Sequence, residues 1–260
     1  MRCFQVFLIA AALAGASARV ASATELPNLA GFYAGLNAGW SWYNLNTTSS
    51  LTGSATTSAV SSSSWYDPIG GVQLGYNWQP ASKWLVGVEA DFQASGVSAS
   101  STQGDVRLNP GLLGAAITET LSRTDSLDWF GTVRGRLGYA VWPNITLYGT
   151  GGLAYGGVSG SAPATVSRVI IVPPFTPETA NATSGASAVK AGWTAGAGIE
   201  GAVPNSRMSW KVEYLHIDLA ALNYGFNAAV FSSNPFQVSN TLSSKFGDDM
   251  IRVGLNLHFN

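Results

Sequence analysis

Charged side chains are scarce in this chain of 260 residues, of which only 10% are Asp, Glu, Lys or Arg. Soluble domains usually contain about 25%. The 13 basic and 14 acidic residues nearly cancel and form no basic run, which excludes a surface that tracks nucleic-acid phosphates. The hydrophobic content of 46% excludes a disordered chain. We therefore expect part of the surface to face something other than water.

The N-terminus has the features of a secretory signal peptide. Arg2 precedes an apolar stretch that ends at Ala14 and is shorter than the roughly 17 residues of a membrane-spanning helix. Two Ala-x-Ala cleavage patterns follow, ending at Ala18 and Ala23, and we favour cleavage at the second. Residues 1–23 are thus expected to be removed on export, with an uncleaved membrane anchor as the alternative.

Removal of this segment leaves a mature chain, residues 24–260, which we interpret as one domain. It loses Cys3, the only cysteine, so it is expected to form no disulfide and to carry no reactive thiol. It also lacks an apolar run of about 18 residues, which argues against membrane-spanning helices.

The mature chain instead shows hydrophobicity that alternates with a period of two, as in a strand with one apolar side. Between Gly31 and Tyr43, one face carries Phe32, Ala34, Leu36, Ala38, Trp40 and Trp42. The same alternation predicts eight strands of roughly ten to fifteen residues. These lie at 31–43, 69–79, 84–95, 127–141, 144–158, 190–203, 208–219 and 249–259.

Short and long connections alternate strictly between these strands. The short ones are 80–83, 142–143 and 204–207, and the long ones are 44–68, 96–126, 159–189 and 220–248. Alternating segments with this spacing are typical of a transmembrane barrel, in which closure pairs every backbone group and the apolar face meets lipid. We predict an all-β fold: an eight-stranded antiparallel up-and-down transmembrane β-barrel with short periplasmic turns and four long extracellular loops.

Eight charged residues fall inside the strands on the face opposite the large apolar ones. They are Glu89, Asp91, Arg134, Arg136, Glu200, Lys211, Glu213 and Arg252. A soluble lipocalin-type barrel, the alternative fold, would point its apolar faces inward and explains this arrangement poorly.

Counting from the short turns places these charges at matching heights. The count sets Glu89 beside Arg136, Asp91 beside Arg134, Glu200 beside Lys211 and Glu213 beside Arg252. Buried charges need partners, because an unpaired one costs several kcal/mol. We interpret the set as a polar plug, with a gate that exchanges partners as the alternative; a wide pore is excluded because side chains fill an eight-stranded interior.

Several segments together resemble the small opacity-type outer-membrane barrels of Gram-negative bacteria, often called the porin family. The matching segments are 31–35 (GFYAG), 70–76 (GGVQLGY), 86–91 (VGVEAD), 133–139 (VRGRLGY), 147–154 (LYGTGGLA), 192–200 (GWTAGAGIE) and 211–214 (KVEY). The resemblance implies a location in the bacterial outer membrane, contact with its lipid and lipopolysaccharide, and a contribution to envelope integrity. It also implies recognition of the last strand by the barrel-assembly machinery, although Asn260 here follows the aromatic Phe259. Some relatives bind haem, adhere or form weak pores.

Two long loops contain apolar residues that could form an exposed contact patch for adhesion or haem binding. The candidates are Val169, Ile170, Ile171, Val172, Phe175, Phe231 and Phe236. The alternative is that these loops pack on each other or lean on lipopolysaccharide. No cofactor is expected from the sequence.

Enzymatic activity is not expected. The chain has two histidines, His216 and His258, too few and too far apart for a metal-binding pair. The string Gly-x-Gly-x-x-Gly at 196–201 lies inside a predicted strand, without the helix that nucleotide binding requires. A lipid A-modifying enzyme remains the less favoured alternative, and His216 with Asp218 is its candidate pair.

Overall fold

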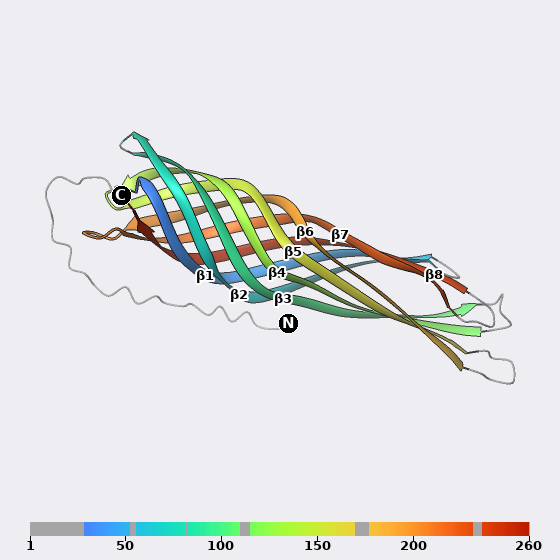
Figure 1. The fold of residues 1–260 in the computed structure, drawn as a ribbon. Helices are drawn as coiled ribbons and strands as arrows, with labels where there is room; N and C mark the ends of the chain where they lie inside the picture. The colour runs from blue at the N-terminus through green and yellow to red at the C-terminus, as the bar shows by residue number, and fades with distance from the viewer. Residues whose placement is uncertain are drawn as a thin grey trace.

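The computed structural model describes residues 29–52, 56–81, 83–109, 115–169, 177–230 and 236–259. They form β1 (Gly31–Thr52), β2 (Thr56–Ala81), β3 (Trp84–Asn109), β4 (Ala115–Trp142), β5 (Ile145–Val169), β6 (Pro177–Ala202), β7 (Met208–Val230) and β8 (Phe236–His258). Each strand pairs antiparallel with its neighbours in chain order, and β8 pairs with β1 to close the barrel (Figure 1). The predicted eight-stranded antiparallel barrel is confirmed. Within the described ranges, no helix is long and apolar enough to cross a membrane.

The strands are longer than the alternation predicts, at 22 residues for β1 and up to 28 for β4. The long connections occur where expected, but most of their residues continue the strands, so that β1 and β2 stay paired as far as Thr52 and Thr56. These segments are rich in Ser, Thr and Ala, and their buried apolar residues, such as Leu45, Leu222 and Leu242, are too widely spaced to give a continuous alternating pattern in the sequence. The ladders continue through these segments because backbone hydrogen bonds between strands do not depend on the type of side chain.

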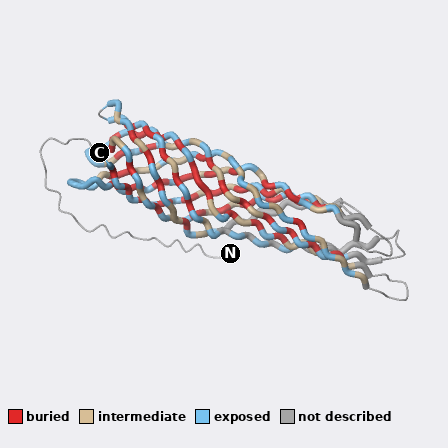
Figure 2. Tube along the Cα trace, in the orientation of Figure 1, coloured by how far each residue is buried: buried red, intermediate tan, exposed pale blue. Residues whose placement is uncertain are grey.

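A continuous apolar band surrounds the part of the barrel nearest the short turns. Buried and exposed residues alternate along every strand (Figure 2). The outward positions carry large apolar side chains, including Phe32, Leu36, Val72, Leu74, Val133, Leu153, Val253 and Leu255. On β1 the outward face turns polar beyond Trp42, at Asn44 and Asn46. This apolar outer wall fits lipid and contradicts the lipocalin alternative.

Aromatic side chains gather at both margins of the band. At the margin near the short turns, the rings of Trp84 and Tyr139 lie 5.1 Å apart. At the other margin, Trp129 stacks on Phe92 at 5.6 Å. Such belts sit at the two headgroup levels of a membrane. We take the membrane-spanning part of each strand as the part between them, which on β8 is residues 251–259.

Beyond the band, the barrel divides into two four-stranded sheets. Among the described residues, pairing of β2 with β3 ends at Ile69 and Ser95, and pairing of β6 with β7 ends at Gly192 and Leu219. The other neighbouring strands remain paired further outward. One sheet therefore contains β3 to β6, and the other contains β7, β8, β1 and β2. We call these paired sheets the stalk.

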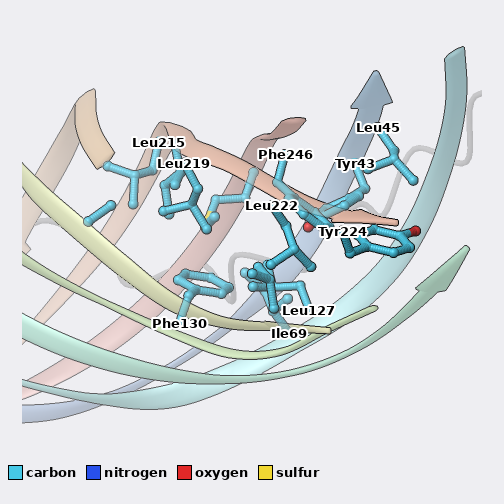
Figure 3. Packing of buried hydrophobic residues seen from close by; sticks show 14 of the residues in the cluster. Tyr43, Leu45, Ile69, Leu127, Phe130, Leu215, Leu219, Leu222, Tyr224 and Phe246 are labelled. Carbon is cyan, nitrogen blue, oxygen red and sulfur yellow. The ribbon is translucent and has the colours of Figure 1, made fainter. Parts of the chain in front are cut away.

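Apolar side chains fill the interior where the barrel passes into the stalk (Figure 3). We call this cluster the apolar plug: Tyr43, Leu45, Ile69, Leu127, Phe130, Ala154, Val158, Ala162, Leu215, Ile217, Leu219, Leu222, Tyr224, Leu242, Phe246 and Met250. Glycine makes room for it in one place, because a Cβ on Gly160 would come within 2.7 Å of the Tyr224 ring. The two sheets thus share one hydrophobic interior.

The position of the apolar band can be tested with arginine on the outer wall. Leu36→Arg puts a charge near the middle of the band, and we expect it to lower the free energy of unfolding by about 2–4 kcal/mol. Thr48→Arg, on the same face of β1 but beyond the band, should change it by less than about 1 kcal/mol. Urea titration in lipid vesicles, followed by tryptophan fluorescence, measures both. Equal losses for the two variants would show that the band is misplaced.

Candidate functional site

The lumen near the short turns holds all eight charged residues identified in the sequence, and all of them are buried. The period-two alternation explains their position, since each shares a strand face with the residues that point away from lipid. They come from β3, β4, β6, β7 and β8, so the closed sheet brings together residues that are up to 163 positions apart, from Glu89 to Arg252. We call these eight residues the ionic plug.

Two arginines connect the acids on opposite walls of the lumen. Arg134 forms ion pairs with Glu89, with Asp91 at 2.9 Å and with Glu213 at 2.9 Å. Arg252 binds two of the same acids, Asp91 at 2.8 Å and Glu213 at 2.6 Å. Because each arginine spans two or three carboxylates, the plug crosslinks β3, β4, β7 and β8.

Arg136 and Lys211 complete the ionic plug on the side of the short turns. Arg136 pairs with Glu200 at 2.6 Å, while its guanidinium carbon lies 4.3 Å from the centre of the Tyr148 ring. The Lys211 ammonium donates to both carboxylate oxygens of Glu89 at 2.8 Å. Tyr33 donates its hydroxyl to Glu89 at 2.7 Å. Four acids and four bases therefore neutralise one another.

The predicted heights need a correction. Glu89 lies level with Arg134 rather than Arg136, and Asp91 lies level with Thr132. Counting from the short turns ignores the stagger of neighbouring strands that closure of a barrel requires. The levels of Glu200 with Lys211 and of Glu213 with Arg252 are as predicted. Residues at the same level are still not always partners, because contacts also form across the lumen. Lys211 bonds Glu89 instead of Glu200, and Glu200 pairs with Arg136.

Uncharged partners that sequence reasoning missed lie at the end of the lumen nearest the short turns. Glu200 accepts hydrogen bonds from Ser209 at 2.6 Å and from Asn256 at 3.0 Å. The Ser209 hydroxyl also lies 3.0 Å from His258 Nε2. The acid thus accepts its hydrogen bond from the serine and lies 3.9 Å from His258 Nε2, whereas in a catalytic triad the acid hydrogen-bonds the histidine and orients it. The only indication of Ser209, Asn256 and His258 in the sequence was that they lie on the strand face that points into the lumen.

The apolar plug was also missed, although the sequence contained a sign of it. Along the inward face of β7, the charged pair Lys211 and Glu213 gives way to Leu215, Ile217 and Leu219, all of them buried. An inward face that turns from charged to apolar marks the depth at which the lumen changes character. The interior thus has two successive layers, ionic and then apolar.

A buried acid, Asp125, ties the two sheets of the stalk together beyond the apolar plug. It lies on β4, accepts a hydrogen bond from Tyr224 on β7 at 2.8 Å and another from Ser244 on β8 at 3.2 Å. Arg123 pairs with its other oxygen at 2.9 Å. Burial raises the pKa of Asp125 above its ordinary value, and these partners oppose the rise.

A second buried acid, Asp248, lies among the apolar side chains Tyr43, Ile217 and Phe246, just outside the membrane-spanning part of β8. The Ser41 hydroxyl donates a hydrogen bond to it. Burial raises the pKa of Asp248 to about 7; the adjacent Asp249 charge adds to the rise, and the Ser41 hydrogen bond opposes it. Around neutral pH this carboxyl therefore exchanges its proton inside an apolar layer.

The candidate enzyme pair is not formed as the sequence suggested. His216 bonds Asp249 on β8 through Nδ1 at 2.8 Å, whereas Asp218 pairs with Lys245 at 2.9 Å. In an antiparallel pair, the residue directly across the ladder is nearer than the one two positions along the same strand. All four side chains face outward, away from the lumen.

Most of the predicted loop patch lies outside the described residues, namely Ile170, Ile171, Val172, Phe175 and Phe231. Val169 ends β5 and Phe236 begins β8, but their side chains are not described. The predicted signal segment 1–23 and Asn260 also lie outside the described ranges.

Comparisons with known proteins agree with this geometry. A family model described as "Outer membrane protein beta-barrel domain" matches residues 8–259. The chain is 39% identical over 198 residues to the 31 kDa outer-membrane immunogenic protein of Brucella melitensis, covering 74% of this chain and 66% of that protein. It is 30% identical over 190 residues to the 22 kDa outer membrane protein of Rhizobium leguminosarum, covering 73% and 65%. The matches thus span slightly less than two thirds of these relatives.

Among solved structures, the chain is similar to the outer membrane protein OprG from Pseudomonas aeruginosa. The TM-score is 0.44 with 12% sequence identity, and the match covers 88% of this chain and 97% of that one.

The ionic plug predicts a large difference between buried and exposed ion pairs. Arg134→Met leaves buried carboxylates without their partner, and we expect it to lower the free energy of unfolding by about 3–5 kcal/mol. The exposed pair offers a matched control, since Lys245→Met should cost less than about 1 kcal/mol. Combining Arg134→Met with Glu213→Gln should recover part of the loss. Urea titration in vesicles checks all three, and a loss for Arg134→Met no larger than for Lys245→Met would contradict the assignment.

Asp248 predicts a specific pH dependence of stability. Because its pKa is raised in the folded state, the folded chain holds this proton more tightly than the unfolded chain. The contribution of Asp248 to stability should therefore be fully present below the ordinary carboxyl pKa of about 4 and should be lost as the pH rises to about 7. Asp248→Asn should flatten this part of the curve. The difference between the two unfolding curves across this range isolates Asp248 from other groups, and parallel curves would refute the effect.

Proposed function

Because the chain belongs to the outer membrane protein β-barrel domain family, we propose that it is mainly a structural protein of the outer membrane whose lumen is closed by two layers in series. In this role it contributes to envelope integrity and permits, at most, weak conduction. The observation that carries the proposal is the succession of ionic plug and apolar plug along a single lumen.

The ionic plug supports closure because its charges are already occupied. An ion entering this layer must displace partners such as Arg134 and Glu213, which lie 2.9 Å apart. The arrangement crosslinks opposite walls, so partner exchange would need several pairs to break together. Charged residues fixed in this way stiffen the barrel instead of forming a selectivity path.

The apolar plug supports closure by a different mechanism. Hydrophobic constrictions exclude water and ions by dewetting. Phe130, Leu215 and Phe246 are no more than 1% exposed and belong to one buried cluster inside the barrel (Figure 3). An ion that passed the ionic layer would lose its hydration here among side chains that carry no charge, with the Asp248 carboxyl as the titratable group beside them.

The barrel exposes features that suit its surroundings. Its partners on the outer wall are membrane lipid and lipopolysaccharide, which meet the apolar band and its aromatic belts. Phe259, which follows the last strand, is offered to the barrel-assembly machinery; in the folded barrel this residue is 61% exposed, and its amide donates a hydrogen bond to the Phe32 carbonyl.

Single-channel recording in planar lipid bilayers tests the closed lumen. We expect no stable conductance steps from the refolded wild type, because either layer alone blocks the path. Arg134→Ala with Arg136→Ala should open only the ionic layer, and Phe130→Ser with Phe246→Ser only the apolar one. The combined variant should conduct. Each protein is first checked for the heat-modifiable migration of a folded barrel.

The controls separate the two layers. Stable steps from the wild type would overturn the closed lumen. Steps from the arginine variant alone would show that the apolar plug does not seal, and steps from the phenylalanine variant alone would show the same for the ionic plug.

A further inference from the structure

A polar cluster lies on the outer wall of the barrel and takes no part in the contacts that fill the lumen. Asp249 on β8 lies directly across the ladder from His216 on β7 and, on its other side, from Trp42 on β1. Trp193 on β6 lies across from Asp218, and its ring centre is 5.0 Å from that of His216. We call the outward residues Trp42, Trp193, His216, Asp218, Lys245 and Asp249 the wall patch.

The hydrogen bonds fix what His216 offers to a ligand. The Asp249 carboxylate accepts the Tyr214 hydroxyl at 2.5 Å and lies 2.8 Å from His216 Nδ1. A carboxylate only accepts, so Nδ1 carries a proton, and in its neutral form the imidazole keeps a lone pair on Nε2 for a ligand. The His216 side chain is 33% exposed. It therefore presents an oriented hydrogen-bond acceptor at the surface.

The neighbours add the other elements of a polar binding surface. Trp193 is 51% exposed, which leaves part of its indole available for stacking. The Lys245 side chain is 56% exposed beside Asp218, so it can donate to a ligand while it keeps its ion pair. Two acids and one lysine leave no excess of positive charge, which favours hydroxyl groups over an isolated phosphate.

The level of the wall patch limits which molecules reach it. It lies at the outer margin of the apolar band, where β1 turns polar at Asn44 and β8 turns polar at Asp249. Beyond it, β8 extends from Lys245 back to Phe236, about 30 Å of strand at 3.3 Å per residue. The wall patch is thus at the foot of the stalk, beside the headgroups of the outer leaflet.

We propose that the wall patch binds the sugar headgroup of the glycolipid that forms this leaflet, lipopolysaccharide. A sugar ring has an apolar C–H face that stacks on tryptophan, and hydroxyl groups that donate to His216 Nε2 and Asp218 and accept from Lys245. This site does not depend on whether the lumen conducts.

Histidine NMR gives a direct test, because the chain contains two histidines. The protein, labelled with ¹⁵N in histidine, is placed in nanodiscs of phospholipid with increasing amounts of lipopolysaccharide. We expect the His216 ring signals to shift while those of His258, buried in the lumen at the other end, stay in place. Movement of both or of neither would overturn the proposal.

Variants separate a sugar site from a general aromatic belt. Trp193→Leu should raise the lipopolysaccharide fraction that gives half of the His216 shift about fivefold, and Lys245→Ala, an exposed change that leaves the fold intact, should also raise it. Trp129→Leu, on β4 and two strands away from Trp193, changes an aromatic residue at the same margin outside the wall patch; it is the control and should not. If the two tryptophan substitutions raised the half-shift fraction equally, the wall patch would be part of a general aromatic belt, and the proposed sugar site would be refuted. Heat-modifiable migration confirms that each variant is folded.

A final experiment distinguishes a sugar anchored in the membrane from a free sugar in solution. Deacylated lipopolysaccharide, added as a soluble oligosaccharide, should shift His216 only at a concentration far above that needed when the sugar is anchored in the membrane. Equal potency of the soluble form would show a site for free glycans and overturn the assignment to the leaflet.

Discussion

A peptide group in hydrocarbon has no water to bind, so every N–H and C=O of a membrane-spanning strand must find its partner within the sheet. Pairing of β8 with β1 meets this demand by leaving no edge. Closure then forces every inward side chain into one narrow space. Charges such as Arg134 and Glu213 can occupy that space only as neutral groups of partners, and the ionic plug is a consequence of the closed ladder.

The two layers of the lumen differ in what they contribute. The ionic plug gives directional contacts that hold opposite walls in register, whereas the apolar plug gives non-directional packing. Their order follows the environment outside: the ionic layer lies within the lipid band, and the apolar layer lies where the sheet begins to divide. Packing across the interior, in the buried cluster that contains Leu127 of β4 and Leu219 of β7, holds the two sheets together where strand pairing no longer does.

The fold could be predicted from the sequence because, in a membrane-spanning strand, apolar residues that face lipid alternate with residues that face the lumen. The same pattern identified which charged residues face inward. It could not give their partners, because the stagger of strands is a property of the closed barrel: Arg136 reaches Glu200 across the lumen, and no count along the chain reveals this. The stalk was missed for another reason, since its Ser- and Thr-rich strands are paired through backbone groups. The link between His216 and Asp249 likewise depends on which residues oppose each other across the ladder.

The ladders that join β1 to β2 and to β8 run without a register shift, and this constrains how such chains can diverge. A single residue inserted into β1 between Trp42 and Tyr43 would turn every later side chain of that strand to the opposite face, and would expose Leu45 while burying Asn46. An insertion of two residues keeps the faces and only lengthens the stalk. Related chains are therefore expected to differ in the length of β1 by even numbers of residues, so that the reach of this strand beyond the membrane changes in steps of two residues.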